Sequence, residues 1–367
     1  MKQLKHNKRM LMAKWLGTFG ISGIGWTCCC ALMCFALCAG CSSTTDFPQV
    51  EITNDLVVAN VYLPDPNVGY YRGTRFDWAG VIGWLQYKGH DYFGPWFDRI
   101  DATVHDFVFE GPYIVSGTCS GTSGPVEEFR TGSTALGFDE AKPGGTFIKI
   151  GVGVLRRPDA EAYDNYRDYE IVDSGKWLIN CARDMVEFVH ELTDQATGYG
   201  YVYTKRLLLT KAKAEMVIEH TLKNTGSRTI QSSVYNHNFF VLDNETTGPD
   251  FTITVPFEIK STSRSDLIAI QGNEIRFLKK LQDKDVAMVG IRGFGDSAKD
   301  YDIRIYNKKV GAGVRITGDR PLSREMLWSI RSVLTLEPFI DMTVEPGGEF
   351  TWKLSYEFYT NGNIEVP

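Results

Sequence analysis

Short segments of alternating side chains constrain the fold of this sequence more than any other feature. They are densest from residue 166 to 243, where apolar and polar residues alternate with the period of two that marks a β-strand with one buried face. The segments predicted there as strands span residues 169–172, 186–193, 199–209, 215–223 and 229–240. No stretch longer than about ten residues keeps a 3.6-residue apolar period. The chain is therefore predicted to be all-β, with two packed sheets.

Strand patterns also occupy the rest of the chain beyond residue 50. Further predicted strands span residues 50–63, 81–87, 147–155, 251–259, 274–278, 286–291, 301–306, 314–317, 327–342 and 350–359. The segment from residue 105 to 157 is rich in glycine and is interpreted as long loops, apart from the strand at 147–155. No linker divides the sequence, so residues 50–367 are predicted to form one domain.

The N-terminus carries the pattern of an export signal. Five basic residues precede a charge-free stretch from Trp15 to Gly40, which ends in Ala39-Gly40-Cys41. This ending resembles a bacterial lipobox, so residues 1–40 are predicted to be a signal peptide, Cys41 to carry lipid, and residues 41–49 to be a tether. The protein would then be anchored in the bacterial cell envelope, in the periplasm or at the outer membrane. An uncleaved membrane helix is the alternative interpretation.

Charge and cysteine content narrow the choice of partners. The whole sequence has a formal net charge of −6, and removal of the basic signal makes the remainder more acidic. Nucleic acid and anionic lipid are therefore not expected as partners. Besides Cys41, the exported chain keeps Cys119 and Cys181, which could form a disulfide or remain two separate thiols and which fit no zinc-binding spacing.

The stretch from Tyr235 to Asp243 contains the first candidate for catalysis. His237 lies between two asparagines, and alternation places it on one strand face with Tyr235 and Phe239. A face of hydroxyl, imidazole and aromatic groups is typical of a sugar-binding cleft. His237 is either a hydrogen-bonded structural residue or a proton donor, whereas His220, among apolar residues of its strand, is predicted to be a core histidine.

A second candidate group is a carboxylate 100 residues further on. Glu337 ends an apolar strand and shares a face with Thr335 and Phe339. Alone it is typical of a solvated edge charge. Together with His237 it predicts an acid and a base on opposite sides of one small substrate.

The two regions resemble motifs of the aldose 1-epimerase (galactose mutarotase) superfamily. The first is the run from Asn236 to Leu242, and the second is Leu336-Glu337-Pro338 followed by Pro346-Gly347-Gly348-Glu349-Phe350. The resemblance implies a large antiparallel β-sandwich without a cofactor or metal. It also implies a sugar or oligosaccharide as partner and interconversion of sugar anomers, with His237 as acid and Glu337 as base.

Substrate-binding residues are less well defined by sequence. The family's substrate arginine and second histidine lie in the first half of the chain, where the nearest matches are Arg72, Arg75 and His105. The remaining predicted substrate-binding residues are Tyr235, Asn236, Glu127 and Glu128.

Two other functions remain open at this point. The chain could be a carbohydrate-binding lipoprotein that has lost turnover. It could also be a lyase or hydrolase on the same fold, in which Glu127 or Glu128 joins Glu337 as a carboxylate pair.

Overall fold

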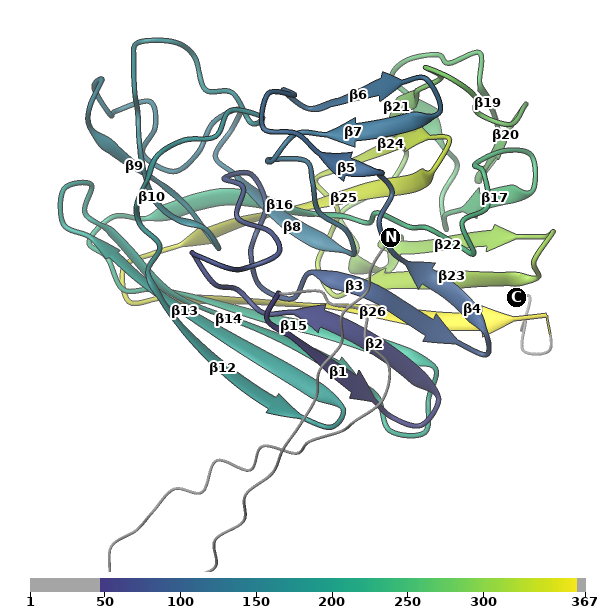
Figure 1. The fold of residues 1–367 in the computed structure, drawn as a ribbon, viewed down its shortest axis with the longest axis horizontal. Coiled ribbons are helices and arrows are strands. Elements are labelled where there is room, and N and C mark those ends of the chain that lie inside the picture. The colour runs from purple at the N-terminus through teal and green to yellow at the C-terminus, as the bar shows by residue number, and fades with distance from the viewer. Residues whose placement is uncertain (1–46, 362–367) are drawn as a thin grey trace, which may run out of the picture. The chain divides into compact units, whose positions relative to one another are not determined.

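The computed structural model describes residues 47–361, so the predicted signal peptide, Cys41 and most of the tether lie outside the described residues. Strands dominate this part of the chain (Figure 1). Its one helix is the 3-10 turn η1, Ala298–Asp300, and no described helix is long and apolar enough to cross a membrane. The predicted all-β class is confirmed.

The largest sheet has ten strands. In spatial order they are β12 (Lys176–Ala182), β13 (Met185–Asp194), β14 (Tyr199–Leu209), β15 (Glu215–Asn224), β26 (Glu349–Thr360), β23 (Ala312–Gly318), β22 (Asp302–Asn307), β17 (Phe251–Thr254), β20 (Glu274–Phe277) and β19 (Ile268–Gln271). Buried and half-buried residues alternate along β13, β14 and β15, as expected for strands with one face on the core.

The second large sheet has six strands. In spatial order they are β18 (Lys260–Ser261), β21 (Ala287–Arg292), β24 (Arg324–Ile330), β25 (Val333–Val344), β16 (Ile230–His237) and β8 (Val126–Arg130). All of these pairings are antiparallel. The sheet therefore joins the two regions that contain His237 and Glu337.

Three smaller sheets complete the fold. The first is formed by β1 (Gln49–Thr53), β2 (Val57–Tyr62), β3 (Ile82–Tyr87) and β4 (His90–Phe93). The others are formed by β9 (Thr146–Lys149), β10 (Gly153–Arg156) and β11 (Ile171–Asp173), and by β5 (Arg99–Ile100), β7 (Tyr113–Ser116) and β6 (Phe107–Glu110). The short β5–β7 pairing is parallel, an exception to the otherwise antiparallel architecture.

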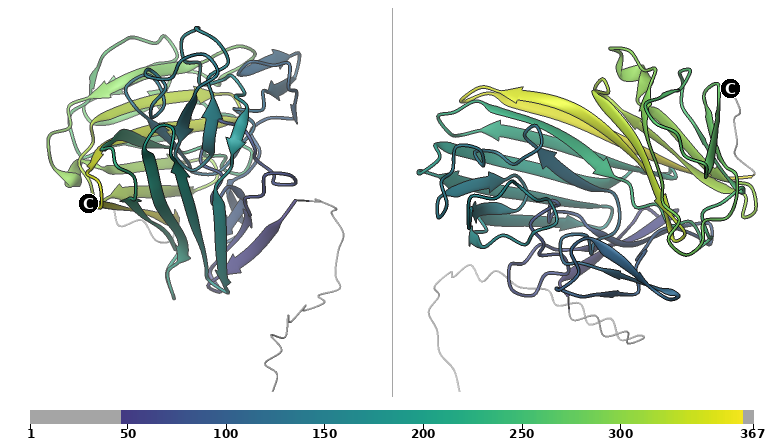
Figure 2. Two further views of the ribbon diagram at one scale, coloured as in Figure 1. Left: turned by 90° about the vertical axis from the view of Figure 1, so that its left-hand side faces the viewer. Right: turned by 90° about the horizontal axis from the view of Figure 1, so that it is seen from above.

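The main core lies between the two large sheets, which form curved layers (Figure 2). Val234 and Leu336 of the six-stranded sheet belong to the same buried cluster as Leu207 and Ile218 of the ten-stranded sheet. Val333, on the opposite side of β25 from Leu336, belongs instead to a second aromatic cluster with Phe239. The six-stranded sheet thus has an inner face in the sandwich core and an outer face under the smaller sheets, where the candidate site lies.

Three predicted segments differ from the structure because turns interrupt them. The expected strand at 50–63 is the hairpin β1–β2, where Asn54 Oδ1 accepts bonds from the amides of Leu56 and Val57 and ends the strand. The expected strand at 327–342 is also a hairpin, since β24 ends before Arg331. The expected strand at 147–155 is the hairpin β9–β10, interrupted by a turn at residues 150–152, and the predicted loops before it also contain the short strands β6, β7 and β8.

Candidate active site

Two adjacent glutamates of β8 point to opposite faces of the six-stranded sheet. Glu127 and Glu128 are both fully buried. Glu128 accepts a bond from Tyr235 on the outer face, whereas Glu127 accepts one from Asn236 on the inner face. Because successive side chains of a strand alternate, β8 takes part in two separate polar clusters.

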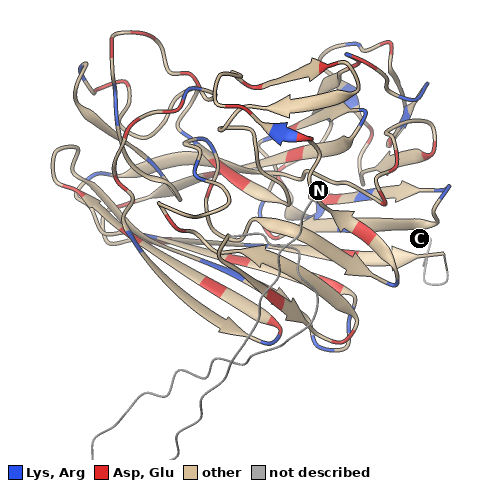
Figure 3. Ribbon diagram, viewed as in Figure 1, with Lys and Arg blue, Asp and Glu red and all other residues tan. Residues whose placement is uncertain are grey.

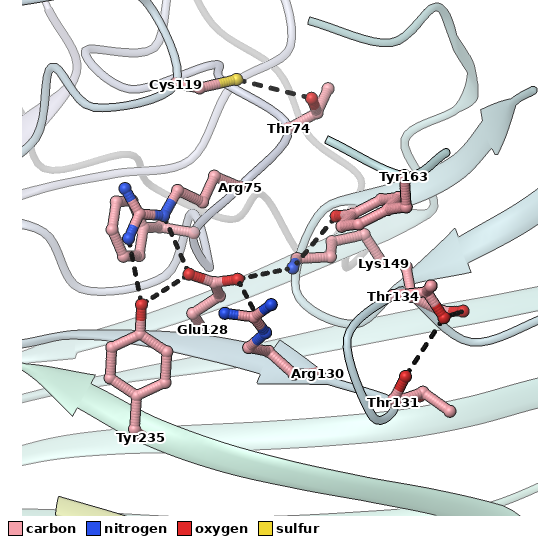
Figure 4. Close-up of polar contacts among 12 residues, drawn as sticks. Thr74, Arg75, Cys119, Glu128, Arg130, Thr131, Thr134, Lys149, Tyr163 and Tyr235 are labelled. Atoms are coloured by element: carbon pink, nitrogen blue, oxygen red, sulfur yellow. Dashed lines mark hydrogen bonds and ion pairs between the residues drawn. The ribbon is translucent and has the colours of Figure 1, made fainter. Parts of the chain in front are cut away.

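The outer cluster surrounds the Glu128 carboxylate with donors (Figure 4). Arg75 Nε donates to Glu128 Oε2 over 2.8 Å, and the Tyr235 hydroxyl donates to the same oxygen over 2.6 Å. Arg75 Nη2 also donates to the Tyr235 hydroxyl over 3.1 Å. On the other oxygen, Oε1, Lys149 Nζ lies at 3.3 Å and Arg130 Nε at 3.8 Å.

These cations keep Glu128 ionised despite its burial. Burial alone would raise its pKa, but Lys149, Arg75 and Arg130 hold the pKa of Glu128 well below its usual range. Three cations surround one carboxylate, so the outer cluster carries excess positive charge beside His237 and Glu337.

The pairing of β16 with β25 brings the two predicted catalytic residues together. Tyr235 lies opposite Phe339, and continuing this antiparallel register by two residues sets His237 opposite Glu337. His237 Nε2 and Glu337 Oε1 are 3.3 Å apart. The expectation that they lie on opposite sides of a substrate is therefore wrong: they touch.

Aromatic rings confine this pair. The His237 ring stacks on Phe239 at 3.8 Å between centroids and meets the edge of Trp328 at 5.5 Å. His237 Nδ1 lies 3.4 Å from the Thr335 hydroxyl. Only 6% of the His237 side chain and 12% of the Glu337 side chain are exposed.

Burial moves the two pKa values in opposite directions. It raises the pKa of Glu337 to about 7, against the opposing influence of Arg75. It lowers the pKa of His237 well below its usual value, and Arg75 lowers it further. The pair therefore holds its proton on Glu337 below about pH 7, next to a neutral imidazole.

Three of the seven predicted substrate-binding residues gather near this pair, whereas Arg72 does not. Arg75, Tyr235 and Glu128 form the outer cluster. Arg72 is exposed and donates to the carbonyl of Asn67 in its own loop, away from the outer cluster.

His105 lies at the rim of the site. Its Nε2 is 2.6 Å from Asp164 Oδ2, and 65% of its side chain is exposed. Its ring contacts Tyr166, whose ring in turn lies 4.8 Å from the Arg75 guanidinium. His105 thus contacts the outer cluster indirectly, through Tyr166.

Glu127 and Asn236 belong to the inner face, which corrects their predicted role in binding substrate. The Glu127 carboxylate contacts Lys205 Nζ, and its Oε1 lies 2.9 Å from His220 Nε2. Lys205 and His220 come from the ten-stranded sheet and are buried. His220 is therefore a core histidine, and Glu127 cannot join Glu337 on the outer face as a carboxylate pair.

Basic residues of both buried clusters were missed by sequence reasoning. Lys149 and Lys205 each lie in an apolar strand, at positions where alternation predicts a buried side chain. A buried lysine needs a carboxylate partner, and this signal could have linked both residues to Glu127 and Glu128. Arg130 carried no comparable signal, because it lies at a strand end.

The described residues contain no group of three His, Cys, Asp or Glu side chains placed to hold a metal ion. Cys119 is buried and Cys181 exposed, and both are free thiols, so the disulfide alternative is excluded.

Comparison with known proteins places this geometry in a known architecture. No family model matches the sequence, and no curated protein matches it.

Solved structures do match this fold. The Slr1438 protein from Synechocystis sp. PCC 6803 aligns with a TM-score of 0.50 and 12% identity over 88% of this chain and 100% of that one. A galactose mutarotase related enzyme from Lactobacillus acidophilus aligns with a TM-score of 0.50 and 12% identity over 87% of this chain and 100% of its own. The fold is that of the galactose mutarotase-like proteins. The resemblance seen in the sequence is confirmed at the level of fold.

Within this galactose mutarotase-like sandwich, the outer cluster is expected to be a strong determinant of stability. Lys149→Met removes one buried partner of Glu128, and we expect the free energy of unfolding to fall by about 3 kcal/mol or more. Adding Glu128→Gln to this variant should lower the stability further, because the buried guanidinium of Arg75 then loses its carboxylate partner. Urea denaturation of the two variants and the parent measures both effects.

The matched control is Lys176→Met, which removes a cation that is 64% exposed and lies 3.5 Å from Glu191. An exposed pair of this kind contributes about 0–1 kcal/mol. Equal losses for Lys149→Met and Lys176→Met would show that the outer cluster does not stabilise the fold more than an exposed ion pair.

Proposed function

We propose that this protein interconverts the anomers of an aldose, with His237 and Glu337 as an acid–base pair. The observation that carries the proposal is the contact of 3.3 Å between His237 Nε2 and Glu337 Oε1 on the outer face of the sheet. The opposed pKa shifts support it, since they leave a carboxylic acid beside a neutral imidazole near neutral pH. The galactose mutarotase-like fold supports a sugar as substrate.

An adjacent pair suits this reaction, because the ring oxygen and the anomeric hydroxyl are bonded to the same carbon. The Glu337 carboxyl donates its proton to the ring oxygen while His237 Nε2 takes the proton of the anomeric hydroxyl. The bond between the anomeric carbon and the ring oxygen breaks, and an open-chain aldehyde forms. After rotation about the bond between C1 and C2, the ring closes on the other face of the carbonyl.

Ring closure restores the pair. The imidazolium of His237 returns a proton to the carbonyl oxygen, and the Glu337 carboxylate takes the proton from the attacking hydroxyl. For ring opening, the resting protonation supports Glu337 as acid and His237 as base, the reverse of the roles that the family resemblance implies. Arg75 favours the anionic form of Glu337 that ring opening creates.

Anomer exchange measured by NMR tests the proposal. Glu337→Gln and His237→Asn should each slow the exchange of an accepted aldose by on the order of 10² to 10⁴. The double variant should lose far less than the product of the two single losses, because both groups act in one step. The rate should also fall as pH rises through about 7, where Glu337 loses its proton.

Two outcomes would oppose the proposal in different ways. Protein that binds a sugar but leaves its anomers exchanging at the buffer rate would favour a binding lipoprotein without turnover. Exchange that survives both substitutions would place the chemistry on other residues.

We also propose that the protein works in the cell envelope, held by lipid on Cys41. The support is the small-residue ending Ala39-Gly40-Cys41 after an apolar stretch. In cells, Cys41→Ser should abolish lipid labelling and move the protein out of the detergent phase on partitioning. Unchanged partitioning would favour an uncleaved membrane helix instead.

A further inference from the structure

A row of basic side chains crosses the six-stranded sheet beside Glu337. Lys260 of β18 lies opposite Arg292 of β21. Gly290 lies opposite Met326, so the same antiparallel register sets Arg292 opposite Arg324 of β24. Like charges directly opposite one another destabilise a sheet unless something neutralises them.

No carboxylate of the described residues performs that neutralisation. Basic and acidic residues are interspersed over the ribbon as a whole (Figure 3), and most arginines have an acidic partner. Neither Arg292 nor Arg324 forms an ion pair with a described acidic residue within 4.0 Å. Arg292 donates only to the carbonyl of Ile291 beside it, and the buried Nε of Arg324 has no hydrogen-bond partner.

Arg324 is also held in position. Its guanidinium lies 3.6 Å from the centroid of the Phe339 ring, which stacks on Tyr235 at 4.2 Å. Burial, together with Arg130 and Arg292, lowers the pKa of Arg324, which reflects the concentration of positive charge around it. A braced, unpaired guanidinium loses little side-chain entropy when it binds an anion.

Both arginines line a cavity of about 220 Å³. Its wall also contains Thr262, Ser263 and Met326, and Met326 lies directly opposite Glu337 on the neighbouring strand. The hydroxyl-bearing residues can add hydrogen bonds to an oxyanion. Since a water molecule takes up about 30 Å³ of liquid, the cavity has room for roughly seven waters, or for one charged group with part of a sugar ring.

The acidic residue in the cavity wall does not cancel this charge. Glu325 is fully buried, and its neighbours Arg324 and Met326 occupy the opposite side of β24 by alternation. Burial raises the pKa of Glu325 to about 8, so it is mostly uncharged at neutral pH.

We infer that the cavity lined by Arg292 and Arg324 binds the oxyanion of an acidic sugar, a carboxylate or a phosphate, while its anomeric carbon lies at the His237–Glu337 pair. The inference rests on the proposed function for the position of the anomeric carbon. The cavity spans one to two strands beyond Glu337, which corresponds to about 5–10 Å. This distance is comparable with the separation of the anomeric carbon from a charged group on C6 of a hexose.

Calorimetric titration compares acidic sugars with their neutral counterparts. Galacturonate and glucuronate test the carboxylate, and galactose 6-phosphate and glucose 6-phosphate test the phosphate, each against galactose or glucose. We expect at least one acidic sugar to bind about 10-fold or more tightly than its neutral counterpart, because each arginine supplies charge-assisted hydrogen bonds. A preference for the sugar acids identifies the bound oxyanion as a carboxylate, and a preference for the sugar phosphates identifies it as a phosphate.

Arg292→Gln and Arg324→Gln should each remove most of that preference and leave affinity for the neutral sugar nearly unchanged. The matched control is Arg276→Gln on the ten-stranded sheet, where an exposed arginine pairs with Glu274. It should keep the preference. Arg292 is exposed, so its variant should fold even if Arg324→Gln does not, and Arg324→Lys should then retain part of the preference.

The same samples separate this inference from the proposed function. Wild-type protein that binds no acidic sugar better than its neutral counterpart, or a preference that survives both arginine substitutions, overturns the inference whatever the rate of anomer exchange. A preference lost in both variants upholds the anion site even where no sample exchanges anomers, and in that case the proposed isomerase function alone fails.

Discussion

The structure depends on the burial of two consecutive glutamates in one short edge strand. Glu127 and Glu128 are completely buried on opposite sides of β8, and each is ionised because cations from other segments lie close to it, Lys205 at Glu127 and Arg75 and Lys149 at Glu128. Removing a carboxylate from water costs several kcal/mol, and close cations with complete hydrogen bonding are needed to offset that cost. The two clusters therefore specify which segments must pack on each face of β8.

The segment around Asp77 shows how the two faces are coupled. Arg75 binds Glu128 on the outer face, while Lys205 from the ten-stranded sheet donates to the carbonyl of Ala79 over 2.7 Å and lies 3.7 Å from Asp77. The amide of Asp77 donates to the backbone carbonyl of Glu127 over 2.9 Å. Arg75 is thus positioned by contacts that extend into the sandwich core, and Arg75 in turn affects the pKa values of both His237 and Glu337.

Sequence periodicity predicted the elements of this fold but not their pairing. The strand expected at 199–209 has the bounds of β14, and His220 was correctly assigned to the core, because alternation determines which side chains share a face. Alternation within one strand carries no information about its neighbours. The contact between His237 and Glu337, the opposite orientation of Glu127 from Glu337, and the row formed by Arg292 and Arg324 all depend on strand order and register.

The buried pair of His237 and Glu337 holds one proton, which resides on Glu337 below about pH 7. Infrared difference spectra between the parent protein and Glu337→Gln, recorded from pH 5 to 9, observe that proton directly. We expect the carbonyl stretch of a protonated carboxylic acid at pH 5, its loss with a midpoint near pH 7, and the matching appearance of a carboxylate band. A Glu337 carboxyl that is already ionised at pH 5, with an ordinary midpoint near 4.3, would contradict this expectation.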